Sequence, residues 1–195
     1  MKKIEVKIKK NEEKIIPFIW IDGEEPEVFY DIHLVGEGAK VTLVGILLGT
    51  NSHNAVFNTR VVHEAQNTTS LTTIRGVFKD HASFNNDGMV RITKGAKNAD
   101  GYFASKILLF DDAKGRSVPS LEIDENELKA GHASTVGRPD EEQMFYLRSR
   151  GLAEKEAEQL IISGFFQPVI QLLTANEQEE VQEKLASVYN SYEKL

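Results

Sequence analysis

Residues 131–137 read GHASTVG, and residues 138–152 read RPDEEQMFYLRSRGL. The first stretch is a run of small residues around His132, and it closes a region whose apolar residues mostly alternate at period two. In the second stretch, Asp140 and Gln143 have the spacing of a helix capping box, and Gly151 suits a helix end. The junction therefore predicts two domains, a β-rich core over residues 1–138 and a helical subdomain over residues 139–195.

The region before the junction contains a series of short apolar segments separated by turn residues. IEVKIKK places Ile4, Val6 and Ile8 on one face, and KVTLVGILLG is continuous enough to be buried on both sides. Further strands are expected to begin near Val28, Val41, Val56, Ser70, Met89, Tyr102 and Val118. The stretches between them, among them GTNSHN and HASFNNDG, are typical of turns.

This spacing leaves two fold classes open. No helical pattern of adequate length separates the expected strands, which argues against βαβ units. Two strand-plus-turn units of about 15 residues would form one coil of about 30 residues in a parallel β-helix. A β-sandwich fits the same periodicity equally well.

Composition limits the possible functions. The chain has 195 residues, a net charge of −7 and no cysteine. The negative charge argues against a general nucleic-acid binder, and the absence of cysteine excludes thiolate ligands and thiol nucleophiles from this chain. No segment approaches the ~20 apolar residues of a membrane span. Residues 1–22 predict a β-hairpin, not a signal peptide.

The region after the junction predicts further helices. LAEKEAEQLIISGF has helical spacing, with Gly164 as its expected stop. Pro168 should interrupt the next segment, so that a helix restarts there. The last helix, NEQEEVQEKLASVYNSYEKL, is expected to begin with Asn176 as its cap and Glu179 at the third helical position.

Motifs for catalysis are scarce. The chain has no phosphate-binding loop, no G-x-S-x-G elbow and no H-E-x-x-H pair. The other histidines are predicted to lie in loops or at the surface: His33, His53, His63 and His81. Asp111, Asp112 and Asp124 could supply an acid pair for glycoside chemistry, although carboxylates in turns are usually only solvated.

The sequence around the junction resembles the SufB/SufD family, scaffold subunits of the SUF machinery for iron–sulfur cluster assembly. The matching residues are Pro119, Leu121, Glu122 and Ile123, then His132, Thr135, Val136 and Gly137, then Asp140 through Gly151. The resemblance is good over about residues 85–173. It implies a right-handed parallel β-helix flanked by helices, which favours the β-helix over the sandwich. It also implies a cytoplasmic protein.

The chain departs from the family pattern where thiol ligands are expected. Ala104 and Ala130 stand where family members can carry cysteine, and Ala133 follows His132 where SufB has glutamate. The sequence FYLRSRG is more similar to SufD than to SufB. The chain is therefore similar to a short SufD-like member without its own thiols.

The resemblance also implies a site and partners. His132 matches a histidine implicated in cluster assembly at a subunit interface, so it is a candidate ligand for iron or a transient cluster; no cofactor is expected to be tightly bound by this chain alone. The alternative is that His132 hydrogen-bonds a turn at the junction. The helix after the junction is expected to dock a SufC-type ATPase, and the candidate contact residues are Phe145, Tyr146, Arg148 and Arg150. One of the two aromatic residues is expected to pack onto the β-helix instead.

The resemblance implies a non-enzymatic scaffold that dimerises with itself or with a SufB-type subunit and binds neither nucleic acid nor membrane. Two other functions remain open. The chain could be a β-helix enzyme acting on carbohydrate through its carboxylates. It could also be a binding module that has kept the fold and lost the cluster chemistry, which the missing cysteines favour.

Overall fold

The computed structural model describes residues 1–24 and 26–192, with side chains up to Val188. The described residues form ten strands and three helices. The odd-numbered strands are β1 (Lys2–Ile8), β3 (Glu27–Leu34), β5 (Asn54–His63), β7 (Ser83–Ile92) and β9 (Lys114–Ile123). The even-numbered strands are β2 (Glu13–Ile21), β4 (Lys40–Gly49), β6 (Thr69–Phe78), β8 (Ala99–Leu109) and β10 (Leu128–Gly137). The helices are α1 (Glu141–Ser149), α2 (Glu154–Ile170) and α3 (Ala175–Tyr192).

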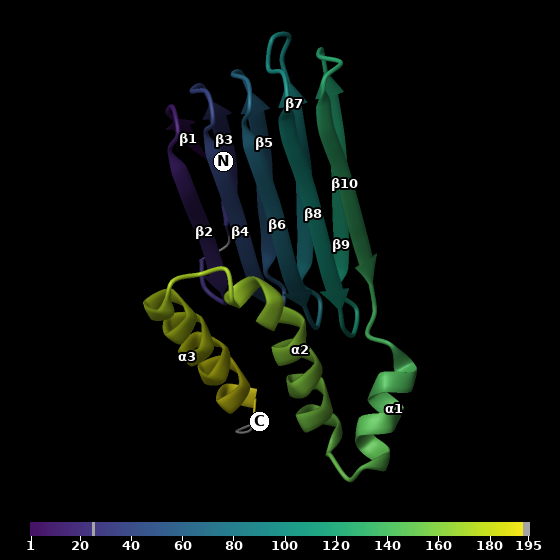
Figure 1. The fold of residues 1–195 in the computed structure, drawn as a ribbon. Helices are drawn as coiled ribbons and strands as arrows, with labels where there is room; N and C mark the ends of the chain where they lie inside the picture. The colour runs from purple at the N-terminus through teal and green to yellow at the C-terminus, as the bar shows by residue number, and fades with distance from the viewer. Residues whose placement is uncertain (25, 193–195) are drawn as a thin grey trace.

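The strands form a parallel β-solenoid of about five turns (Figure 1). The odd-numbered strands pair in the order β1-β3-β5-β7-β9, and the even-numbered strands in the order β10-β8-β6-β4-β2. Every pairing is parallel, so each turn of the chain contributes one strand to each sheet. The fold class predicted from the resemblance is confirmed.

The predicted hairpin over residues 1–22 is wrong. β1 pairs with β3 and β2 pairs with β4, so the two strands belong to different sheets. The predicted start of β7, near Met89, is also wrong. The strand starts at Ser83, and Phe84 and Asn86 of the expected turn HASFNNDG are buried strand residues. In both cases a strand pairs with a segment about one coil away in sequence, which local patterns do not reveal.

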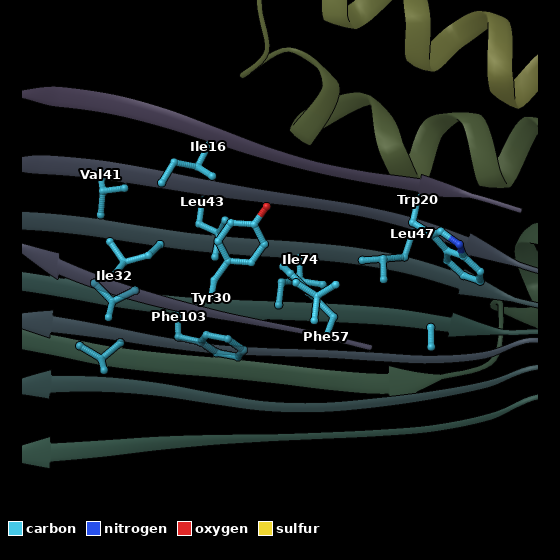
Figure 2. Close-up of a cluster of buried hydrophobic side chains, with 14 of the residues drawn as sticks. Ile16, Trp20, Tyr30, Ile32, Val41, Leu43, Leu47, Phe57, Ile74 and Phe103 are labelled. Carbon is cyan, nitrogen blue, oxygen red and sulfur yellow. The ribbon is translucent and has the colours of Figure 1, made fainter. Parts of the chain in front are cut away.

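The main core fills the space between the two sheets (Figure 2). Alternate residues of each strand point inward, as the burial of β5 and β6 shows. Aromatic rings stack between coils: the ring centroids of Phe18 and Phe57 are 4.4 Å apart, and those of Phe78 and Phe84 are 5.0 Å apart. Coil-on-coil burial of this kind is what holds a solenoid together.

Asparagine and aspartate occupy the corners of the coils. Seven of them adopt positive φ: Asn11, Asp22, Asn51, Asn67, Asp80, Asn98 and Asp111. These are the non-glycine residues that tolerate the left-handed conformation best. Their side chains also tie one corner to the next. The Asn51 amide donates to Asp80 Oδ2 at 2.7 Å, and the Asp80 amide donates to Asp111 Oδ2 at 3.2 Å.

A second core joins α2 and α3 to the outer face of the even-numbered sheet. Ile162, Phe166 and Val169 of α2 are buried against strand residues such as Ile46 and Val77. α2 and α3 lie beside the carboxyl ends of these strands (Figure 1). The last strand ends at Gly137 and α1 begins at Glu141. The division into a β-helix domain and a helical domain stays a prediction, because the solenoid and the helices share this core.

Two predicted helix boundaries are wrong. α2 runs through both Gly164 and Pro168 and ends at Ile170, because apolar residues on either side of the proline pack on the sheet and outweigh the lost hydrogen bond. α3 begins at Ala175, one residue before the expected cap. There the Glu177 carboxylate accepts hydrogen bonds from the Thr174 amide at 2.9 Å and the Thr174 hydroxyl at 2.7 Å. Within the described residues, no helix is long and apolar enough to cross a membrane.

Candidate functional site

The last coil of the solenoid, β9 and β10, forms an open end. The two sheets come close together near Gly115, which stands in register with the large Phe84 of the preceding coil. The Ser134 hydroxyl donates to the Ser117 carbonyl at 3.3 Å, and a Cβ placed on Gly115 would lie 3.0 Å from Val136 Cγ1. No described strand lies beyond β9 or β10, so this end of the core faces outward.

His132 lies in the middle of β10, on an inward position of this open coil. It is in register with Phe103 of β8, a fully buried core residue. Its side chain is nevertheless exposed, because the next coil that would cover it is missing from the described strands. β9 and β10 run in opposite directions, so the contact between Ser117 and Ser134 places His132 opposite Pro119.

The surroundings of His132 bear on its two possible roles. Among the residues that the structure describes, no hydrogen bond or ion pair to its ring is found, so the alternative of a hydrogen bond to a turn at the junction has no partner here. The imidazole is therefore accessible to a ligand or to a second subunit. The predicted role of His132 as a ligand stays a prediction.

The four predicted docking residues lie on or directly after α1, which stands away from the rest of the molecule (Figure 1). Phe145 is 75% exposed and Tyr146 is 56% exposed, so neither ring packs onto the solenoid as we had expected of one of them. The Arg150 guanidinium lies 5.1 Å from the Tyr146 ring centre, and Arg148 Nη1 lies 3.9 Å from Glu154 Oε2. Asp140 caps the helix by accepting from the Glu142 amide at 2.8 Å.

Hollows flank α1 on both sides. A cleft of about 850 Å³ separates it from the turn after β8, with Phe110, Met144 and Phe145 among its apolar lining and Asp111 and Arg138 at its rim. A groove of about 390 Å³ on the other flank is lined by Tyr146, Leu147, Leu160 and Ile161, among others. None of the α1 side chains is buried by the described part of the chain. An exposed aromatic helix between two hollows is suited to binding another protein.

The remaining histidines do not form a metal site. His33 lies in β3, where its ring contacts the carboxylates of Glu64 and Asp31. His53 Nδ1 lies 3.2 Å from Asp22 Oδ1, and His81 is exposed in a turn. No group of three metal-ligating side chains converges within residues 1–24 and 26–192.

His63 corrects the prediction that these histidines lie in loops or at the surface. It is fully buried at the end of β5, with Nδ1 2.8 Å from Thr68 Oγ1 and Nε2 2.8 Å from Ser70 Oγ. The Thr68 hydroxyl already donates to the Ala65 carbonyl, so it accepts from Nδ1–H, and Ser70 donates to Nε2. Burial lowers the pKa of His63 to about 4, so the ring is neutral near pH 7.

Asp31 is another buried ionisable group whose pKa is strongly shifted. Arg60 donates to both of its carboxylate oxygens, at 2.8 and 2.7 Å, and Lys3 Nζ lies 2.9 Å away. The hydrogen bonds from Arg60 hold the pKa of Asp31 well below its usual range, against the opposing effect of burial. This group stabilises the outer face of the odd-numbered sheet and lies far from the open coil.

The carboxylates proposed for glycoside chemistry do not come together. Asp111 and Asp112 lie in the turn before β9, whereas Asp124 follows its last residue. A strand of ten residues separates them by about 33 Å, far more than the spacing of about 5–10 Å that acid pairs in glycosidases need.

A proline in the last coil was missed as a functional signal. The Lys114 amide donates to the carbonyl of Ala82, just before β7, and the Asp124 amide donates to the carbonyl of Ile92, the last residue of β7. The even-numbered amides of β9 therefore face β7. Pro119 therefore stands where an amide would face the open edge, and its lack of an N–H weakens that edge for pairing. A proline inside a period-two segment is the sequence signal for such an edge strand. β10 has no proline, so it is the better edge for accepting a further strand.

The fold and this site define a class of protein: a parallel β-solenoid with an open terminal coil that carries an exposed histidine and is followed by a projecting helix. The chain matches the family model described as SUF system FeS cluster assembly, SufBD core domain, over residues 27–165. The chain belongs to the SufBD family, whose members are components of iron–sulfur cluster assembly.

Curated relatives agree with this assignment. The chain is 36% identical over 157 residues to an iron–sulfur cluster assembly protein SufD of Bacillus subtilis, which covers 80% of this chain and 35% of that protein. It is 32% identical over 178 residues to an iron–sulfur cluster assembly SufBD family protein of Mycobacterium bovis, covering 87% of this chain and 44% of the relative. A SufBD family protein of Mycobacterium leprae is 29% identical over 155 residues, covering 77% of this chain and 18% of the relative. The chain thus spans less than half the length of each of these relatives.

Proposed function

We propose that this chain is a non-enzymatic scaffold subunit of SUF-type iron–sulfur cluster assembly. The observation that carries the proposal is the open coil, where His132 is exposed at an inward position beside a strand edge that can still pair. Membership of the SufBD family supplies the setting, a process that requires subunits to hold and pass on iron and sulfide.

The partner at the open coil is a second solenoid, either another copy of this chain or a SufB-type subunit. Pro119 weakens the β9 edge, so β10 is the strand that pairs. Pairing there would bury the inward residues of the last coil and place His132 inside the interface. Since the chain contains no cysteine, the other ligands of a cluster would come from the partner, from a thiol donor or from water.

The second partner is a SufC-type ATPase that binds α1. The chain has no phosphate-binding loop, so nucleotide chemistry would have to come from such a partner. Phe145 and Tyr146 would anchor the contact, and Arg148 and Arg150 would contribute charged contacts at its rim.

A pull-down and titration calorimetry with a SufC-type ATPase test the docking helix. The double substitution Arg148→Glu and Arg150→Glu should weaken binding of the ATPase about tenfold or more. The melting temperature should stay the same, because both arginine side chains are exposed. The matched control is Lys184→Glu on α3, whose exposed side chain lies on another helix. If the double variant binds as well as the wild type does, α1 is not the docking site.

Anaerobic reconstitution with iron and sulfide tests the open coil. With a SufB-type subunit present, His132→Ala should lower the iron retained per complex and leave the melting temperature within about 1 °C of wild type, since no described group depends on the ring. If the wild type and the His132→Ala variant both form the complex and neither retains iron, the result would favour the second function, a binding module without cluster chemistry. The absence of cysteine is the observation that favours that alternative.

A further inference from the structure

The first coil of the solenoid also has two outer edges, and they differ. In β2 the Asp22 amide donates to the Leu48 carbonyl, so even-numbered amides face β4 and position 17 faces outward. That position is Pro17, which removes a donor from the outer edge. In β1 the Ile8 carbonyl accepts from the Val35 amide, so even-numbered residues bond to β3.

The alternation in β1 leaves three residues with free backbone groups. The N–H and C=O groups of Lys3, Glu5 and Lys7 point away from β3, and no described strand lies on that side. No proline interrupts β1. The β1 edge can therefore form a complete ladder with an added strand, which the β2 edge cannot do.

The side chains of β1 specify what such a strand must carry. On the inward face, Ile4 and Val6 are only partly buried and pack on the core, so apolar neighbours would complete their burial. On the outward face stand Lys3, whose ammonium lies 2.9 Å from Asp31, and Lys7, whose ammonium lies 3.5 Å from Glu5; both lysine side chains are still more than half exposed. Residues 2–14 contain six lysines and three glutamates, so the edge is positively charged overall.

We propose that β1 accepts an extended segment of a partner protein in which apolar and acidic side chains alternate. The added strand would hydrogen-bond to the free backbone of β1, its apolar side chains would cover Ile4 and Val6, and its carboxylates would lie beside Lys3 and Lys7. This interaction is separate from the proposed scaffold function and uses the opposite end of the solenoid.

A second copy of this chain does not fit the β1 edge. Stacking two copies end to end would pair β9 with β1 and β10 with β2, and Pro119 and Pro17 would each remove a hydrogen bond from one of these pairings. Pairing β1 with the β1 of another copy in opposite directions would bring lysines of like charge together. A separate acidic segment meets neither obstacle.

Fluorescence anisotropy with a labelled peptide of sequence Val-Glu-Val-Thr-Val-Glu-Val tests the proposal. The peptide is palindromic, so it offers the same side chains to β1 in either direction, with threonine beside Glu5. It should bind the full chain saturably. A peptide of the same composition in the order Val-Val-Val-Val-Thr-Glu-Glu, and one with lysine in place of glutamate, should bind at least about tenfold more weakly.

Three variants connect that binding to β1. Glu5→Pro removes an outward N–H and no ladder bond, and should weaken binding about tenfold. Glu5→Gln keeps the N–H and releases Lys7 from its ion pair, so it should bind at least as tightly as the wild type does. Lys7→Glu should weaken binding of the acidic peptide about fivefold and strengthen that of the lysine peptide. The proposal would be overturned by equal binding of all three peptides, by unchanged binding to both Glu5→Pro and Lys7→Glu, or by no binding at all. The lysines of β1 would then serve only to prevent edge-to-edge aggregation.

Discussion

Acidification should destabilise this protein through His63, and the structure allows the size of the effect to be worked out. The ring is fully buried between Thr68 and Ser70, and burial lowers its pKa from the ordinary 6.5 to about 4, opposed only partly by the charge of Asp100. In the unfolded chain the same ring is solvated and titrates near 6.5. Between pH 6.5 and 4 the unfolded state therefore binds more protons than the folded state.

The sign and magnitude follow from linkage. Because the unfolded state binds the extra proton, the free energy of unfolding falls as the pH falls through this range. The difference between a pKa of 6.5 in the unfolded chain and about 4 in the folded protein corresponds to about 3 kcal/mol in total, of which about 2 kcal/mol is lost by pH 5. That is a large share of the ~5–15 kcal/mol that stabilises a typical domain. Asp31 acts at lower pH, because its depressed pKa gives stability that is present above its ordinary range and lost below it.

Urea denaturation at a series of pH values from 7.5 to 4.5 measures the effect. Other carboxylates also titrate in this range, so wild type is compared with His63→Gln, which has no proton to gain. The variant is expected to be less stable than the wild type at pH 7.5. Between pH 7.5 and 5, the free energy of unfolding of the wild type should fall by about 2 kcal/mol more than that of the variant. Parallel curves for the two proteins would show that His63 does not titrate as its burial requires.

Three further changes test the packing. Arg60→Ala should cost about 2–4 kcal/mol of unfolding free energy in urea melts, because it leaves buried Asp31 with only part of its charge compensation, and adding Asp31→Asn should restore some of this stability. Gly88→Ala should cost about 1–3 kcal/mol or more, since its Cβ would lie 2.1 Å from Phe103 Cε2; if Phe103→Leu does not relieve that cost, the clash is not its cause. Phe145→Ser should change the melting temperature by no more than about 2 °C, because the ring is 75% exposed, and a larger loss would mean that α1 packs more tightly than it does here.

Local patterns in the sequence were informative wherever the structure depends on local chemistry. Strands begin close to Val28, Val41 and Ser70 as expected, because a turn followed by alternating apolar residues determines where a strand starts. Asp140 was correctly identified as a helix cap because the residues that it serves are adjacent in the chain. The SufBD family was also recognisable, since its characteristic residues form one continuous stretch around the junction.

The errors share a physical cause. The hairpin expected at residues 1–22 failed because β1 and β2 pair with strands about 26 residues further along, and the period-two pattern does not say which strand is the neighbour. The helix expected to stop at Gly164 continues past Pro168 because Phe166 and Val169 gain more from packing on the sheet than the proline costs. His63 was predicted to lie in a loop or at the surface because nothing in its neighbours reveals that it points into the core.

The sequence by itself determined the family, the approximate strand starts and the chemical inventory: one histidine at the junction, two arginines and two aromatic residues on the next helix, and no thiol. Only the tertiary structure decided which of these groups are accessible. His132 has an inward position like that of buried Phe103, and it is exposed because its coil is the last one described. Pro17 and Pro119 become edge signals only when the direction of each amide is known. Such properties depend on the number of coils that stack on each side of a residue, and stacking joins segments that lie about 30 residues apart in the chain.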